Sequence, residues 1–134
     1  MERVVERANV ARRALATLQE LPLDSEPSDI ERDAAIQRFE HTVEAVWKAA
    51  RVFLREFEGV TTALPKGATR ASFQTRLIAE DDARIAMQMI DDRNLTVHTY
   101  NEELARQIYS RLAAYASSME RWLAAMSRAS GMQS

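Results

Sequence analysis

The chain has 134 residues, of which 46% are hydrophobic and 28% charged, with 3 Gly, 3 Pro and no Cys. This balance excludes a disordered tail, a collagen-like repeat and a disulfide scaffold, and the length fits a single helical domain over residues 1–134. The lack of cysteine excludes thiolate catalysis and iron–sulfur clusters, and the net charge of −2 argues against coating of nucleic acid by bulk electrostatics.

No apolar run approaches the length needed to span a membrane, and the N-terminal sequence MERVVERANV lacks the apolar stretch of a signal peptide. We therefore expect a cytoplasmic protein with no membrane contact. The basic residues are 16 Arg and 2 Lys, and arginine favours bidentate pairing with carboxylate or phosphate. A local anion-binding face is compatible with this composition.

The first half of the chain shows helical periodicity. Residues 3–18 place Val4, Leu15 and other apolar side chains at steps of three and four, which predicts one helix. After the loop LPLDSEPSD, Ser28 and Glu31 form a capping box that starts a second helix. Its apolar stripe runs unbroken to Gly59, so this helix extends about 40 Å and needs other helices alongside it.

The second half is also helical. Residues 59–68 read as a loop, and two short helices are expected over 69–78 and 81–92. Thr99 and Glu102 form a second capping box, and the apolar stripe that follows predicts a long last helix. With no strand-like alternation, the sequence predicts an all-α, antiparallel up-and-down bundle of four or five helices.

A polar group precedes the last predicted helix. His98 stands just before Thr99, Tyr100 follows, and Arg93 lies five residues before His98. The amides at a helix start favour an anion there, and a short connection between helices would also bring Asn94 into this region. The group is therefore a candidate anion-binding or catalytic site.

The residue types in this group suit phosphodiester cleavage. That reaction needs a group that moves protons near neutral pH and a fixed cation beside the phosphate. His98 can supply the first and Arg93 the second. The structural alternative is that Asp91 or Asp92 pairs with Arg93 and that the cluster only holds helices together. Both interpretations remain open at this point.

Other possible catalytic or metal-binding residues have less support in the sequence. His41 lies inside the long helix without an obvious acid–base partner and reads as a packing or surface residue. The doubled acids Asp81–Asp82 and Asp91–Asp92 read as solvated groups at helix ends rather than as a metal site. Since a glycine-rich phosphate loop and a Glu-x-x-His pair are also missing from the sequence, we expect neither a metal nor a cofactor.

Two blocks of the sequence resemble the HEPN superfamily, and in particular its HepT-like group, also described as nucleotidyltransferase substrate-binding proteins. The specific block is DDRNLTVHTYNEELARQIYSRL, which carries the family pattern of Arg, four to six residues, His, any residue, Tyr. That pattern falls on Arg93, His98 and Tyr100, with Asn94 as the polar residue that often follows the Arg. The second block, RDAAIQRFEHTVEAVWKAAR, resembles the long helix of the family.

The resemblance implies a metal-independent endoribonuclease that acts as the toxin of a toxin–antitoxin pair. It implies a homodimer in which Arg93 and His98 of both subunits line one cleft and cut RNA. It also implies a partner, a minimal nucleotidyltransferase (MNT) antitoxin, that transfers AMP to Tyr100. The alternative that the resemblance carries is a non-catalytic substrate-binding subunit of a two-component nucleotidyltransferase.

Overall fold

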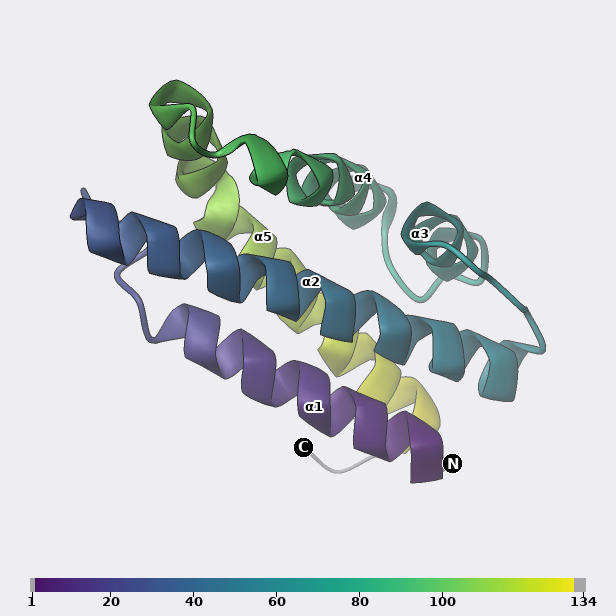
Figure 1. Cartoon of the computed structure of the whole chain (residues 1–134). Coiled ribbons are helices and arrows are strands. Elements are labelled where there is room, and N and C mark those ends of the chain that lie inside the picture. Colours follow the sequence, from purple (N-terminus) through teal and green to yellow (C-terminus); the bar gives the residue numbers. More distant parts are fainter. Residues whose placement is uncertain (1, 132–134) are drawn as a thin grey trace.

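The computed structural model describes residues 2–131, which form α-helices and one short 3₁₀ helix and contain no strand (Figure 1). The predicted all-α bundle is confirmed. The elements are α1 (Glu2–Gln19), α2 (Asp29–Glu58), α3 (Pro65–Gln74), α4 (Glu80–Leu95), η1 (Thr96–His98) and α5 (Glu102–Ser130).

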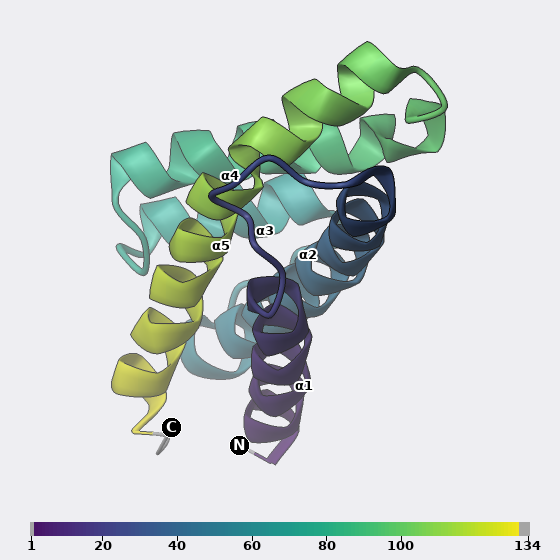
Figure 2. The same ribbon diagram turned by 90° about the vertical axis from the view of Figure 1, so that its left-hand side faces the viewer.

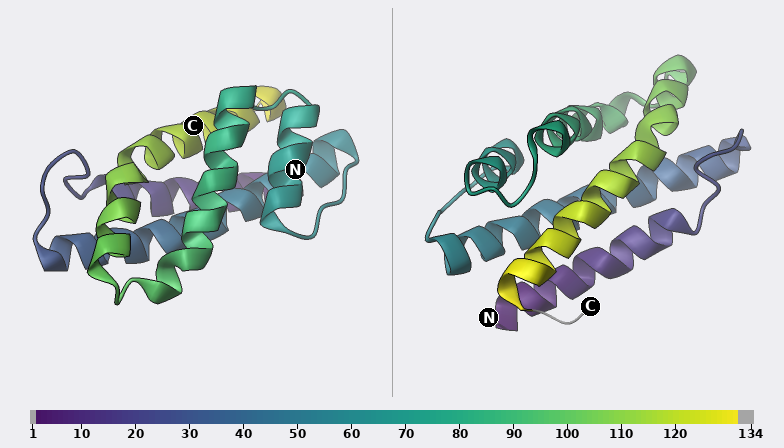
Figure 3. Two further views of the ribbon diagram at one scale, coloured as in Figure 1. Left: turned by 90° about the horizontal axis from the view of Figure 1, so that it is seen from above. Right: turned by 180° about the vertical axis from the view of Figure 1, so that it is seen from behind.

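The three long helices, α1, α2 and α5, pack against one another, and α3 and α4 cross α2 on the side away from α1 (Figures 1 and 3). α1 and α2 are antiparallel, and α5 is inclined to both. The loop between α1 and α2 passes over α5 (Figure 2), where the Tyr109 hydroxyl donates to the Pro22 carbonyl at 2.7 Å. None of the described helices is both long and apolar enough to cross a membrane.

The ends of α2 follow the predicted signals. The Ser28 side chain accepts from the Glu31 amide at 3.1 Å, and the Glu31 carboxylate accepts from the Ser28 amide at 2.8 Å. At the other end Gly59 has a φ of 66°, a left-handed conformation that costs glycine little and stops the helix. The predicted capping box and the predicted length are both confirmed.

The boundaries of α3 and α4 differ from those predicted. α3 begins at Pro65 rather than near residue 69, because proline at the first helical position already has a helical φ and no amide that needs a partner. α4 runs to Leu95, three residues beyond the predicted end. Arg93 and Asn94 therefore belong to the last turn of a helix and not to a connection.

One hydrophobic core joins all five helices. Phe39 of α2 stacks on Tyr115 of α5, with 5.6 Å between the ring centroids, and Trp122 of α5 donates to the Ser72 hydroxyl of α3 at 3.2 Å. The predicted apolar face of α1, from Val4 to Leu18, is buried as expected. α5 thus completes the hydrophobic core that α1 and α2 form. The connection between α4 and α5 lies at the edge of this core.

Candidate functional site

The connection from α4 to α5 carries the predicted group of polar residues. Two threonines shape it. The Thr96 hydroxyl donates to the Arg93 carbonyl at 2.7 Å, and the Thr99 hydroxyl donates to the Thr96 carbonyl at 2.8 Å. Each of these carbonyls also accepts from the backbone amide three residues later, so that the chain turns through one 3₁₀ turn at a defined place. His98 is the last residue of that turn.

The capping box predicted at the start of α5, formed by Thr99 and Glu102, is wrong. Asn101, not Thr99, is the cap, since its side-chain oxygen accepts from the Leu104 amide at 3.1 Å. The 3₁₀ turn uses the Thr99 hydroxyl and delays the helix by two residues. Glu102 and Glu103 occupy the first turn, where their carboxylates offset the positive end of the helix. An anion at this helix start would therefore lie close to two carboxylates.

His98 and Tyr100 lie together on the surface. Their rings meet edge to face at 5.9 Å between centroids, and the Tyr100 hydroxyl oxygen is 3.5 Å from His98 Nδ1. The His98 side chain is exposed, and Tyr100 is 83% exposed. An exposed imidazole beside an exposed phenol can exchange protons with a bound substrate, and the phenol is open to modification.

Arg93 lies deeper, 28% exposed, against α2. Its guanidinium is 3.9 Å from Glu40 Oε2 and 3.8 Å from Glu44 Oε1. Both distances exceed a hydrogen bond, and within the described residues the buried Nε has no hydrogen-bond partner. Arg93 therefore has a charge that two carboxylates partly balance, and its terminal nitrogens, which form no hydrogen bond within the described residues, can donate to an anion.

The structure brings the predicted residues onto one short connection but does not join them all. Within residues 2–131, no hydrogen bond or ion pair links Arg93 to His98. Asn94 is exposed on the last turn of α4, beside Leu95. His41, the other histidine, is exposed on α2.

Sequence reasoning missed a buried ionic cluster next to this site. Asp92 is 4% exposed and accepts from Arg111 at 2.7 and 2.9 Å and from the Tyr115 hydroxyl. Burial, together with the Asp92 carboxylate, raises the pKa of the Tyr115 hydroxyl, and the bond to Asp92 raises the pKa of Arg111. A signal existed in the sequence, because an aspartate in the last turn of a helix is unfavourable without a cationic partner.

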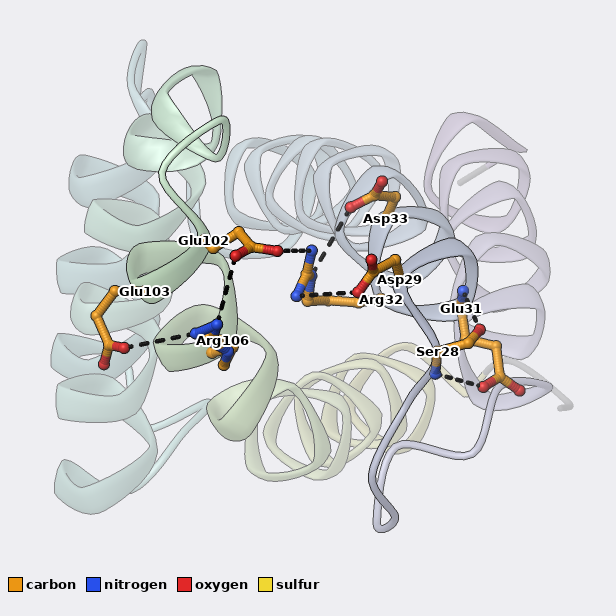
Figure 4. A network of polar contacts seen from close by, with 8 residues as sticks. All are labelled: Ser28, Asp29, Glu31, Arg32, Asp33, Glu102, Glu103 and Arg106. Carbon is orange, nitrogen blue, oxygen red and sulfur yellow. Dashed lines mark hydrogen bonds and ion pairs between the residues drawn. The ribbon is translucent and has the colours of Figure 1, made fainter.

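A second polar network holds the starts of α2 and α5 together (Figure 4). Arg32 reaches Asp29 at 3.6 Å and Glu102 at 3.9 Å, and Arg106 pairs with Glu102 at 3.5 Å. These residues line a cavity of about 470 Å³ under the α1–α2 loop, which Tyr109 also lines. Because Glu102 begins α5, this network links the start of α5, two residues after Tyr100, to the start of α2.

With this geometry in place, the comparisons identify the family. A profile of the family described as "nucleotidyltransferase substrate binding protein like" matches residues 6–128. The chain belongs to that family. The resemblance drawn from Arg93, His98 and Tyr100 is thus confirmed at the level of the family.

This member of the nucleotidyltransferase substrate-binding-like family is also similar to solved structures. A protein from Thermus thermophilus is 54% identical with a TM-score of 0.85, over 87% of this chain and 98% of that one. A toxin–antitoxin structure with AMP-PNP is 15% identical with a TM-score of 0.75, over 92% and 96% of the two chains. A tri-AMPylated Shewanella oneidensis HEPN toxin in complex with MNT antitoxin is 15% identical with a TM-score of 0.73, over 93% and 96%. The last of these shows that the fold is that of a HEPN toxin, and the toxin–antitoxin structure with AMP-PNP shares it. No curated protein sequence matches the chain.

Proposed function

We propose that the chain is a HepT-like toxin, a metal-independent endoribonuclease. The observation that carries this proposal is the exposed imidazole of His98 on a turn that starts directly after α4, the helix whose last turn holds Arg93. The HEPN toxins that share the fold support it. A pure binding surface has no need of a group that transfers protons near neutral pH.

The reaction follows from the two side chains. The 2′-oxygen of a ribose attacks the adjacent phosphorus, the bond to the 5′-oxygen breaks, and His98 moves the proton that the first oxygen loses or the second gains. Arg93 stabilises the charge that develops on the phosphoryl oxygens. The products are a 2′,3′-cyclic phosphate, or its hydrolysis product, and a free 5′-hydroxyl. No step calls for a metal or cofactor.

The active form is a homodimer with the two Arg93–His98 pairs facing one cleft. One arginine and one histidine make a sparse site, and a second copy doubles both. Apolar side chains around His98 support this assembly, since Val97 is 69% exposed and Leu95 40% exposed. Exposed apolar groups next to a functional residue are typical of a protein interface.

Tyr100 is the control point. A partner MNT antitoxin transfers AMP to its hydroxyl, which bonds to the α-phosphate as pyrophosphate leaves ATP. The adduct adds bulk and a negative phosphate beside His98 and near the place where Arg93 would bind the substrate. The bulk excludes the RNA sterically and the negative charge repels its phosphates, as a phosphoryl group on the tyrosine would. The hydroxyl 3.5 Å from His98 Nδ1 supports this assignment.

Incubation of the purified protein with RNA in EDTA tests the proposal. Wild type is expected to cleave, and His98→Ala and Arg93→Ala are expected to lose on the order of a hundredfold or more in rate. Their stability should change by no more than about 1 kcal/mol, because neither side chain is tightly hydrogen-bonded. A strict need for Mg²⁺, or full activity in His98→Ala, would refute the ribonuclease.

The second candidate is a non-catalytic substrate-binding subunit of a two-component nucleotidyltransferase. The description of the matching family favours it. The partial neutralisation of Arg93 by Glu40 and Glu44 also fits a structural role for that arginine. In this case RNA remains intact in the EDTA assay, and the chain instead lowers the KM of the partner nucleotidyltransferase for its substrate.

A further inference from the structure

The last turns of α2 present two arginines, Arg51 and Arg55, which lie one helical turn apart. Within residues 2–131 the charge of Arg55 acts on the neighbouring Glu56 carboxyl, and no close ion pair holds either guanidinium. The Arg51 guanidinium lies over the Trp47 ring at 5.2 Å, which orients it without using its hydrogen-bond donors. Arg55 is exposed. Two guanidinium groups with free donors suit a phosphate.

These arginines line a cavity together with the loop that follows α2. The cavity measures about 270 Å³, and its other lining residues are Thr61, Thr62 and Ala63. The Thr62 hydroxyl oxygen is buried and has no hydrogen-bond partner among residues 2–131. A buried hydroxyl without a partner is costly, and an anion in this cavity would accept a hydrogen bond from it.

The start of α3 adds backbone donors to the same place. Its cap residue Leu64 offers no side-chain acceptor, and its first turn contains Lys66 and no acidic residue. The Thr62 Cβ lies 3.9 Å from the position that a Cβ on Gly67 would take, so Thr62 packs on this first turn. The unpaired amides of a helix start favour an anion, and here they stand beside the unpartnered hydroxyl.

The cavity lies on the same face of α2 as Arg93. Arg51 and Arg55 follow Glu44, the carboxylate beside Arg93, by seven and eleven residues, and both spacings keep residues on one side of a helix. They place the two arginines about 10 and 16 Å from Glu44 along the axis. Lys66 pairs with Asp91 at 2.6 Å, which ties the start of α3 to the end of α4 above α2 (Figure 1).

We propose that Arg51, Arg55 and the Thr62 hydroxyl bind a backbone phosphate of the RNA, a few nucleotides away from the bond that Arg93 and His98 cleave. The inference rests on the proposed ribonuclease function. This site would let a chain with a net charge of −2 bind a polyanion, because Arg93, Arg51 and Arg55 lie along one face of α2. A groove that tracks the phosphate backbone is the usual mode of binding to single strands.

The test measures RNA binding without cleavage, on the His98→Ala background. Polarisation of a short fluorescein-labelled single-stranded RNA is recorded over a range of salt concentrations. Adding R51Q and R55Q should weaken binding about tenfold and make the plot of log K against log salt shallower by about 0.7, the contribution of one phosphate contact on a single strand. The matched control is R13Q with R128Q, which removes two exposed arginines of α1 and α5 and should leave the slope unchanged.

Thr62→Val gives a second, independent readout. It removes the hydroxyl while keeping the shape of the side chain. We expect RNA affinity to fall about threefold and thermal stability to stay the same or rise, because the buried hydroxyl has no partner within the described residues of the free protein. A purely structural role for Thr62 would lower stability and leave RNA affinity unchanged.

The outcomes separate this inference from the ribonuclease itself. If wild type cleaves RNA and R51Q with R55Q leaves affinity and slope unchanged, the phosphate site is refuted and the ribonuclease stands. If wild type fails to cleave RNA but binds it with a slope that R51Q and R55Q reduce, the ribonuclease is refuted and the phosphate site is supported.

Discussion

Asp92 and Arg93 are neighbours in the chain, but their side chains lie on different sides of α4. The Asp92 carboxylate is buried against α5, where Arg111 holds it with two hydrogen bonds of 2.7 and 2.9 Å. The Arg93 guanidinium faces α2 instead. The aspartate that was expected to compete for Arg93 therefore anchors the helix that presents it. The predicted alternative, in which Asp91 or Asp92 pairs with Arg93, is wrong, because Asp91 pairs with Lys66 and Asp92 with Arg111.

Asp92→Ala should destabilise the protein strongly. It removes the acceptor of the Arg111 guanidinium and leaves the buried Tyr115 hydroxyl without a partner, at a cost of about 3 kcal/mol. Asp91→Ala is the matched control, because Asp91 is exposed and pairs only with Lys66 among the described residues, so about 1 kcal/mol or less is expected. Urea unfolding of both variants measures the difference, and equal losses would show that the cluster is not an anchor.

Glu40→Gln should tighten RNA binding. Glu40 is an acidic neighbour that a substrate phosphate must displace from Arg93, and its only partner within the described residues is that arginine. On the His98→Ala background we expect affinity for single-stranded RNA to rise by a few-fold, equivalent to about 1 kcal/mol. Glu6→Gln on α1 removes the same charge far from Arg93 and should have no effect. Weaker binding in Glu40→Gln would mean that the carboxylate positions Arg93 rather than competing for it.

Tyr100→Phe should escape control by the antitoxin while keeping most ribonuclease activity, because its hydroxyl is the proposed AMP acceptor and transfers no proton in the reaction. Intact mass after incubation with ATP and the partner nucleotidyltransferase should show an AMP adduct on wild type and none on Tyr100→Phe. Tyr109→Phe is the control, since the Tyr109 hydroxyl is engaged by the Pro22 carbonyl, and this variant should still be modified. An adduct on Tyr100→Phe would place the acceptor elsewhere.

Asp82 should make stability depend on pH in the acid range. Hydrogen bonds from Arg121 and then Ser118 lower the pKa of this carboxyl. A depressed folded pKa means that its stabilisation is complete above the unfolded value of about 3.9 and is lost as the pH falls through the folded value. Since Arg121 is half exposed, we expect Asp82→Asn to cost only about 1 kcal/mol at neutral pH. Thermal melts of both proteins should converge as the pH drops below about 4, and a constant gap would contradict the assignment.

Much of the fold could be predicted from local signals. The capping box at Ser28, the left-handed Gly59 and the unbroken apolar stripe between them define α2 through short-range chemistry alone. The start of α5 could not be placed in this way. Thr99 and Glu102 have the right spacing for a cap, but Thr99 uses its hydroxyl inside a 3₁₀ turn, and nothing in the local sequence distinguishes the two uses.

The candidate site was predicted by residue type rather than by geometry. The pattern of Arg93, His98 and Tyr100 identifies the residues, and the structure adds that the last two lie together while Arg93 faces two glutamates. Those contacts come from α2, far earlier in the chain, and spacing along one segment cannot reveal them. The cavity beside Arg51 is hidden for the same reason, because its walls come from a helix end and a loop that only the fold brings together.

The 3₁₀ turn that carries His98 precedes α5, the helix that stabilises it, and is therefore synthesised first. α1 and α2 can pair as a local hairpin once both have left the ribosome, whereas Phe39 and Asp92 must wait for Tyr115 and Arg111 of α5. Until α5 has been translated, the backbone around His98 is not held in place by the rest of the fold. We therefore expect the nascent chain to lack the proposed ribonuclease activity, which leaves an interval in which a partner already present can bind the chain as it folds.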